Sequence, residues 1–215
     1  MITDLRPPPK RKFDQFGVTE ETLSARANVL GERGFLTDAK ILFLGDYDLT
    51  SLACLPAQAG LPRAKNTEIW VLDIDPEVLR VVKEQSQGKV FTVQHDLSNP
   101  LPKKLLACFD AVFTDPPYTL EGVALFLSRS LDALTRGERA RVFLSYSSLD
   151  PVRALSVQQK LLDHGVVIEE LRPRFNEYLN AKTIGDSSDL YFLRPTPKFR
   201  PLVRGEYQGK IYTYE

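Results

Sequence analysis

Residues 40–45, KILFLG, decide the fold class of this sequence. An unbroken apolar run closed by glycine is the pattern of a short strand buried on both faces of a sheet. Similar runs recur along the chain, and amphipathic stretches separate them. The predicted strands are 40–45, 68–75, 89–96, the start of 109–118, and 140–147; the predicted helices are 19–34, 49–60 (broken near Pro56), 76–87, 121–134 and 150–165.

Strands that alternate with helices predict an α/β fold with a mostly parallel sheet and helices on both faces. Residues 166–178 and 188–195 read as a closing antiparallel pair, which gives seven strands. We expect one catalytic domain over residues 13–195. The basic, proline-rich residues 1–12 are expected to form a mobile tail, and residues 196–215 a C-terminal extension that is a short strand or docks on the same domain.

Composition and charge exclude several classes of protein. The chain has 215 residues with 28 Lys+Arg and 28 Asp+Glu, so no global positive field gathers nucleic acid. No apolar run approaches the roughly 20 residues of a membrane span, and the N-terminus has no secretory apolar region. Cys54 and Cys108 stand alone in apolar surroundings, which argues against a disulfide or cysteine–zinc scaffold and predicts a cytoplasmic protein. No cluster of residues has metal-ligand spacing.

Acidic residues follow four successive predicted strands. The first strand runs into Gly45-Asp46-Tyr47-Asp48, the second ends at Asp73 and Asp75, the third at Asp96, and the fourth at Asp115. One such acid is usually a helix N-cap, and Asp48 or Thr50 fits that role, as does Asp75. Since parallel strands end at one edge of a sheet, four acids favour a shared ligand site there.

The acids select a cationic, adenosine-containing ligand. A carboxylate after the second strand accepts hydrogen bonds from ribose hydroxyls, which predicts Asp73 for that role. Asp96 is predicted to receive the adenine amino group, whereas His95 beside it is expected to pack or bond locally. Asp46 and Asp48 would repel a pyrophosphate, so NAD and FAD are disfavoured. S-adenosylmethionine, and more so its decarboxylated form, suits this loop on Coulomb grounds.

The most specific motif is Asp115-Pro116-Pro117-Tyr118. The Asp115 side chain and the Pro116 carbonyl can accept hydrogen bonds from one amine and so aim its lone pair at an electrophilic carbon. Proline stiffens the turn and brings no competing N–H. Tyr118 can stack on a flat base or pack over a cation. The motif predicts a nucleophilic amine at this strand end.

These residues resemble the branched-chain polyamine synthases, the bis(aminopropyl)spermidine synthases, within the Rossmann-like S-adenosylmethionine-dependent methyltransferase superfamily. The resemblance covers about residues 12–195, through FDQFGVTEETLSARANVLGERG, ILFLGDYDLTSLA, VLDIDPEVL, HDLSNPLP and FDAVFTDPPYTLEGVALFLSRSL, and more loosely through FNEY and SDLYFL. It implies aminopropyl transfer from decarboxylated S-adenosylmethionine to a polyamine nitrogen, with release of methylthioadenosine.

Two departures from the family pattern bear on this expectation. The family's Gly-Asp-Asp-Asp loop reads Gly45-Asp46-Tyr47-Asp48 here, so acceptor choice or activity is expected to differ. Family members also generally place a winged-helix-like domain ahead of the catalytic one, whereas this sequence begins near the catalytic domain, which predicts a reduced relative. A homodimer is left open.

Each predicted site residue has an expected role. Asp46 or Asp48 would anchor the propylamine of the donor. The predicted site comprises Asp48, Asp115, Pro116 and Tyr118 for catalysis, Gly45, Asp46, Asp73 and Asp96 for the co-substrate, and Tyr47, Pro117, Glu177 and Tyr178 for the acceptor, with no metal.

Three further side chains have predicted environments. Arg129 is expected either to pair with site acids or to be solvated on its helix. Trp70 is expected in the core, and His164 as a cation at a helix C-terminus.

Two other functions compete with aminopropyl transfer. One is methyl transfer from intact S-adenosylmethionine to an amine of nucleic acid or protein, which the basic residues near both ends favour. The other is a degenerate relative that binds its ligand without activity, which Tyr47 favours. Nucleic acid is a partner only under the first of these, and neither involves a membrane.

Overall fold

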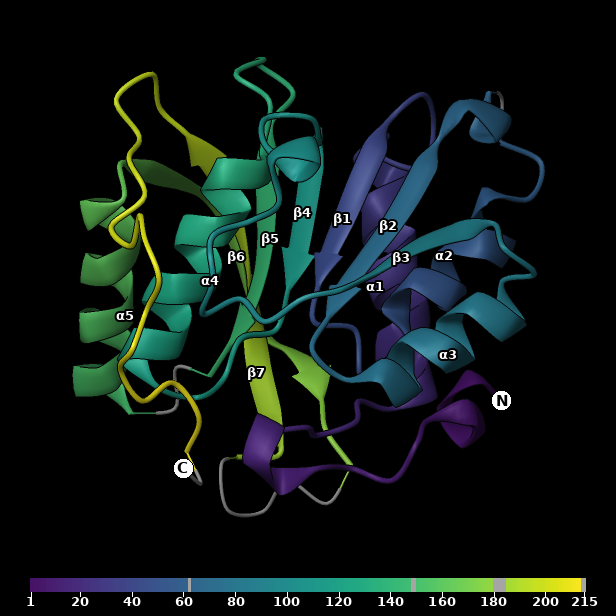
Figure 1. Cartoon of the computed structure of the whole chain (residues 1–215), viewed down its shortest axis with the longest axis horizontal. Helices are drawn as coiled ribbons and strands as arrows, with labels where there is room; N and C mark the ends of the chain where they lie inside the picture. The colour runs from purple at the N-terminus through teal and green to yellow at the C-terminus, as the bar shows by residue number, and fades with distance from the viewer. Residues whose placement is uncertain (62, 148–149, 180–184, 214–215) are drawn as a thin grey trace.

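A seven-stranded sheet with strand order β3-β2-β1-β4-β5-β7-β6 forms the centre of the protein (Figure 1). The computed structural model describes residues 1–61, 63–147, 150–179 and 185–213. The first five strands are parallel, and β7 joins β5 and β6 antiparallel. Their bounds are β1 (Lys40–Leu44), β2 (Glu68–Asp73), β3 (Val90–Gln94), β4 (Ala111–Thr114), β5 (Arg141–Tyr146), β6 (Val166–Glu177) and β7 (Ser187–Pro195).

Helices cover both faces of the sheet and enclose two cores (Figure 1). In β1, Ile41 and Phe43 belong to one core, whereas Leu42 and Leu44 belong to the other. This alternation explains why KILFLG is apolar throughout. The first core packs α1 (Glu20–Glu32), α2 (Thr50–Gln58) and α3 (Pro76–Gln85); the second packs α4 (Leu120–Ala133) and α5 (Pro151–Asp163). The predicted seven-stranded α/β fold is therefore confirmed.

Local details around α2 differ from expectation. The helix continues through Pro56 to Gln58, so the proline does not break it; it withholds one backbone N–H, and the helix ends two residues later. Leu49 is the N-cap residue, with a left-handed φ of 64°, and the carboxylate of Asp46 accepts the backbone N–H of Ser51 in the first turn, so neither Asp48 nor Thr50 has the capping role. Thr19 caps α1, and Asp75 caps α3 as predicted.

The first twelve residues are not a free tail, which corrects the sequence-based expectation. They are part of an N-terminal segment, residues 1–16, which contains two short 3-10 helices, η1 (Ile2–Leu5) and η2 (Arg11–Phe13). Arg6 donates to the backbone oxygens of Val18 and Asp48, and Lys10 forms an ion pair with Asp75 at 2.7 Å. The segment is basic because it binds acidic groups of the domain, a long-range pairing that composition does not show.

The last segment also lies against the domain. No strand forms within its described residues, 196–213. Arg129 of α4 is completely buried and donates hydrogen bonds to the carbonyls of Leu97, Ser98, Val203 and Gly205. The expectation that Arg129 pairs with site acids or is solvated is therefore wrong, since its guanidinium holds loop carbonyls together.

His164 is not a solvated cation. It is the C-cap residue of α5 but is fully buried, and burial lowers its pKa. Its ring nitrogens lie 3.0 Å from the Ser128 hydroxyl and 2.7 Å from the Lys160 carbonyl. Trp70 is half-buried and stacks on Phe91 of the neighbouring strand, which places it at the edge of the second core.

Other general features bear on the class of protein. None of the helices in the described part of the chain combines the length and apolar character needed to cross a bilayer. Within that same part, no three His, Cys, Asp or Glu side chains are grouped so as to hold a metal ion.

Candidate active site

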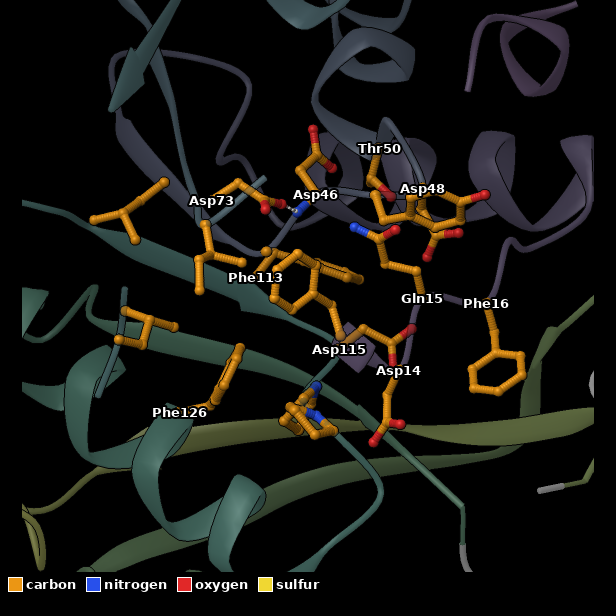
Figure 2. Close-up of a pocket in the computed structure, with 18 of the residues that line it drawn as sticks. Asp14, Gln15, Phe16, Asp46, Asp48, Thr50, Asp73, Phe113, Asp115 and Phe126 are labelled. Atoms are coloured by element: carbon orange, nitrogen blue, oxygen red, sulfur yellow. Dashed lines mark hydrogen bonds between the residues drawn. The ribbon is translucent and has the colours of Figure 1, made fainter. Parts of the chain in front are cut away.

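A cavity lies at the carboxyl ends of the parallel strands, where the strand order reverses between β1 and β4. The cavity and its open mouth together contain about 840 Å³ of empty space. Five carboxyl side chains from the strand ends and the N-terminal segment line it: Asp14, Asp46, Asp48, Asp73 and Asp115 (Figure 2). Arg26 is the only Lys or Arg among the described lining residues.

Arg26 lines the cavity and forms ion pairs with two of its carboxylates. This α1 residue is 1% exposed and packs over the Phe113 ring. Its guanidinium forms ion pairs with Asp48 at 2.8 Å and with Asp115 at 2.7 Å, and its Nε donates to Asn176 at 2.7 Å. Burial alone would lower the pKa of Arg26, but the two carboxylates outweigh it and raise the pKa, so the residue is a fixed cation.

Asp48 is fully engaged in this network. Its Oδ2 accepts from Arg26, and its Oδ1 accepts the backbone N–H of Val18 at 2.7 Å and lies 3.7 Å from Arg6. A carboxylate with two arginines beside it has little remaining charge to offer a ligand. Asp48 therefore holds α1 and the N-terminal segment in place at the edge of the cavity.

Asp115 keeps one oxygen available. Its Oδ2 accepts from Arg26 and from the Tyr178 hydroxyl, both at 2.7 Å, whereas no hydrogen bond from a described residue reaches Oδ1. Burial raises the pKa of Asp115 to about 6, although Arg26 and Tyr178 oppose the rise. A half-buried carboxylate with one free oxygen and a pKa of about 6 is suited to accept a proton from an amine.

Asp46 and Asp73 form a second acidic pair at the ends of β1 and β2. Burial raises the pKa of Asp46 to about 8, although hydrogen bonds from Ser51 oppose the rise. The Asp73 oxygens accept the backbone N–H groups of Asp46 and Asp75 at 2.9 and 2.8 Å (Figure 2). Each oxygen has a second lone pair, so Asp73 is held rigidly and can still accept from two hydroxyls.

Most of the other predicted residues line the same cavity. Gly45 has a φ of +72°, so its backbone turns sharply at the end of β1 in a conformation that favours glycine. The remaining lining residues from the prediction are Tyr47, Pro116, Pro117, Tyr118 and Tyr178. Tyr118 is 8% exposed and meets Phe16 and Tyr178 edge-on, and burial raises its pKa well above 10.

Two predicted residues do not reach the cavity. Asp96 is half-buried and accepts the backbone N–H of Ser98 in its own turn, while His95, expected only to pack or bond locally, lines the cavity instead. The Glu177 side chain is exposed, and only its backbone bonds to Thr19 and Thr22. The strand alternation sends Glu177 outward next to Tyr178.

Sequence reasoning missed several lining residues. Arg26 stands three residues after Leu23 and four before Leu30, in the middle of an apolar helix face; a cation there is a sign of a buried ion pair. Asp14, Gln15 and Phe16 follow the supposed tail, and Tyr212 lies in the last segment. Nothing in their local pattern distinguishes them from surface loop residues.

The sheet order, with the acids at its carboxyl edge, defines a Rossmann-like α/β fold like that of the S-adenosylmethionine-dependent methyltransferases. A methyltransferase of this kind from Aquifex aeolicus has a TM-score of 0.55 at 15% identity, covering 89% of this chain and 95% of its own, a likeness of fold alone. The model of the branched-chain polyamine synthase A C-terminal domain matches residues 1–194. The chain belongs to this family.

Individual relatives agree with the assignment. The chain is 39% identical over 211 residues to an uncharacterized Methanocaldococcus jannaschii protein, covering 97% of this chain and 51% of that protein. It is 38% identical over 189 residues to the N(4)-bis(aminopropyl)spermidine synthase of Thermococcus kodakarensis, covering 83% and 51%. The chain thus spans about half the length of the curated relatives it matches.

A solved relative has ligands. The branched-chain polyamine synthase from Thermus thermophilus, in complex with N4-aminopropylspermidine and 5'-methylthioadenosine, has a TM-score of 0.82 at 29% identity. The match covers 98% of this chain and 66% of that one.

Proposed function

We propose that this chain transfers an aminopropyl group from decarboxylated S-adenosylmethionine to a nitrogen of a polyamine. The observation that carries the proposal is the charge of the cavity, where five carboxyl groups face one guanidinium. Such a cavity favours polycations and disfavours anions. The ligands of the Thermus thermophilus relative support the same reaction, and the free cysteines Cys54 and Cys108 are consistent with a cytoplasmic enzyme.

The charge also distinguishes the two donors. Intact S-adenosylmethionine has a carboxylate that needs a cationic partner, whereas the decarboxylated form has only a sulfonium and an ammonium. Arg26 is the only guanidinium or ammonium among the described lining residues, and Asp48 and Asp115 already bind it. The decarboxylated donor therefore fits the cavity better.

On the donor side, Asp73 receives the two ribose hydroxyls of the adenosine. Asp46 binds the ammonium of the propylamine, since Asp48 is occupied by Arg26 and Arg6. An arriving ammonium stabilises the ionised form of Asp46, whose pKa is about 8 in the free protein, so binding at neutral pH releases a proton. Gly45 lets the backbone approach the donor closely.

On the acceptor side, the free Oδ1 of Asp115 takes a proton from the acceptor ammonium and releases it to solvent; the ionised Oδ1 and the Pro116 carbonyl then accept hydrogen bonds from the neutral amine and align it. The nitrogen lone pair attacks the carbon next to sulfur, the C–S bond breaks, and its electron pair stays on sulfur in methylthioadenosine. The charge leaves the sulfonium and appears on the alkylated nitrogen. Alignment of the two reactants supplies much of the rate, and Tyr118 packs over the cation.

The test is product mass analysis with both donors and a panel of amines. Mass gain of one aminopropyl group from the decarboxylated donor alone supports the proposal. Asp115→Asn should lower kcat roughly 10²- to 10⁴-fold, whereas Asp110→Asn, at the opposite end of the same strand, serves as the matched control. Full activity of Asp115→Asn would remove its assigned role.

The competing functions give different outcomes in the same assay. Methyl gain from intact S-adenosylmethionine would identify a methyltransferase, the function suggested by likeness to that class of fold. Tight donor binding with no product from any amine would identify a binding protein without activity. Tyr47 does not favour the latter strongly, because its hydroxyl has a structural partner, the Pro7 carbonyl.

A further inference from the structure

We infer that Asp14, in the N-terminal segment, binds a second ammonium of the acceptor, remote from the nitrogen that attacks. The inference rests on the proposed function and deepens it. Asp14 would make the enzyme select acceptors with at least two amine groups over monoamines.

One carboxylate oxygen of Asp14 has hydrogen-bond partners among the described residues, and the other has none. Oδ2 accepts from the backbone N–H and the hydroxyl of Thr213 at 2.8 and 2.9 Å. Oδ1 is shielded from solvent but has no hydrogen-bond partner among the described residues. A shielded carboxylate oxygen without a partner costs free energy, which an ammonium ligand would recover.

The other four carboxyl groups of the cavity have partners or separate roles. Asp48 and Asp115 bind Arg26, Asp46 bonds to Ser51, and Asp73 accepts two backbone N–H groups. Asp14 is therefore the carboxylate most available to a cation that is neither the donor nor the reacting amine.

Aromatic residues line the same cavity as Asp14. Phe13 packs against Tyr212, and Phe16 meets Tyr118 of the amine-binding motif edge-on. Asp14 and Tyr118 both line the cavity, and the Tyr118 ring packs against Tyr146. Aromatic walls with a carboxylate between them suit a methylene chain that ends in an ammonium.

The N-terminal segment that positions Asp14 is held at several points. Arg6 binds the Asp48 carbonyl, the Tyr47 hydroxyl donates to the Pro7 carbonyl at 3.2 Å, and Lys10 pairs with Asp75. Tyr47 occupies the position of the middle acid of the motif that the sequence resembles. Here its hydroxyl helps to hold the segment that supplies Asp14.

The test compares two acceptors with wild type and Asp14→Asn. One acceptor is a linear triamine, and the other is the same molecule with a terminal ammonium replaced by methyl. Asp14→Asn should raise the KM for the triamine roughly 10- to 100-fold, leave the donor KM unchanged, and leave the KM for the methyl-ended analogue unchanged. Asp4→Asn, exposed in the same segment, is the matched control.

Two results would overturn the inference. If Asp14→Asn raises the KM for both acceptors equally, Asp14 does not bind the remote ammonium. If Thr213→Val raises the KM for the triamine as much as Asp14→Asn does, then Asp14 acts only by holding the last segment. Calorimetric titration with the triamine alone separates this inference from the proposed function. If wild type transfers no aminopropyl group, the proposed function fails. The difference in triamine affinity between wild type and Asp14→Asn still decides the role of Asp14.

Discussion

Replacement of Arg26 by methionine tests the buried ion network directly. The change removes the guanidinium from between Asp48 and Asp115 but keeps an apolar side chain over Phe113. Breaking a buried ion pair by removing one partner typically costs about 3–5 kcal/mol, because the other charge stays buried. We expect a loss of free energy of unfolding in this range at neutral pH.

The loss should depend on pH in a defined direction. Without Arg26 the pKa of Asp115 rises above its present value of about 6, further from the unfolded value of about 4. A group whose pKa is raised by folding contributes full stability below the unfolded pKa and loses it as the pH rises through the folded pKa. The variant should therefore be closest to wild type near pH 4 and fall furthest behind it above pH 6.

Urea unfolding across this pH range measures the difference. The matched control is Arg80→Met, which removes an exposed ion pair with Glu84 and should cost less than about 1 kcal/mol at every pH. If Arg26→Met is no more destabilising than Arg80→Met, or if its deficit is the same at all pH values, the network does not act as described.

Three further predictions concern Asp46 and Arg129. Burial raises the pKa of Asp46 to about 8. The free energy of unfolding of wild type relative to Asp46→Asn, measured in urea, should therefore fall as the pH rises from about 4 through 8. A difference that does not change with pH would contradict the raised pKa. Proton release on donor binding at neutral pH, measured by calorimetry in buffers of different ionisation enthalpy, should disappear in the same variant. Arg129→Met leaves the carbonyls of Leu97 and Val203 without their buried donor. Amide hydrogen exchange in residues 203–213 should therefore accelerate under conditions where the domain stays folded. Unchanged exchange would show that other contacts hold this segment in place.

The sequence predicts the sheet well because burial on two faces is a local pattern. Ile41 and Leu42 face different cores, so the whole strand is apolar and can be recognised without its partners. The acids at Asp46, Asp73 and Asp115 are predictable for a related reason, since parallel strands bring their carboxyl ends to one edge.

The parts that the sequence does not predict depend on distant partners. Arg26 and Asp115 are 89 residues apart, and Arg129 binds carbonyls on either side of it in the chain. Asp96 follows a strand like the other acids, yet its carboxylate closes its own turn, because a short-range N–H is available at Ser98. No local periodicity distinguishes these outcomes.

The hydrogen bonds between Asp14 and Thr213 join two segments that are 199 residues apart in the chain. Each segment therefore helps to hold the other against the domain, so loosening one makes the other more accessible to proteases. Protease cleavage after Lys10 should speed digestion near Tyr212, and a bound ligand that bridges the two segments should slow both cuts together.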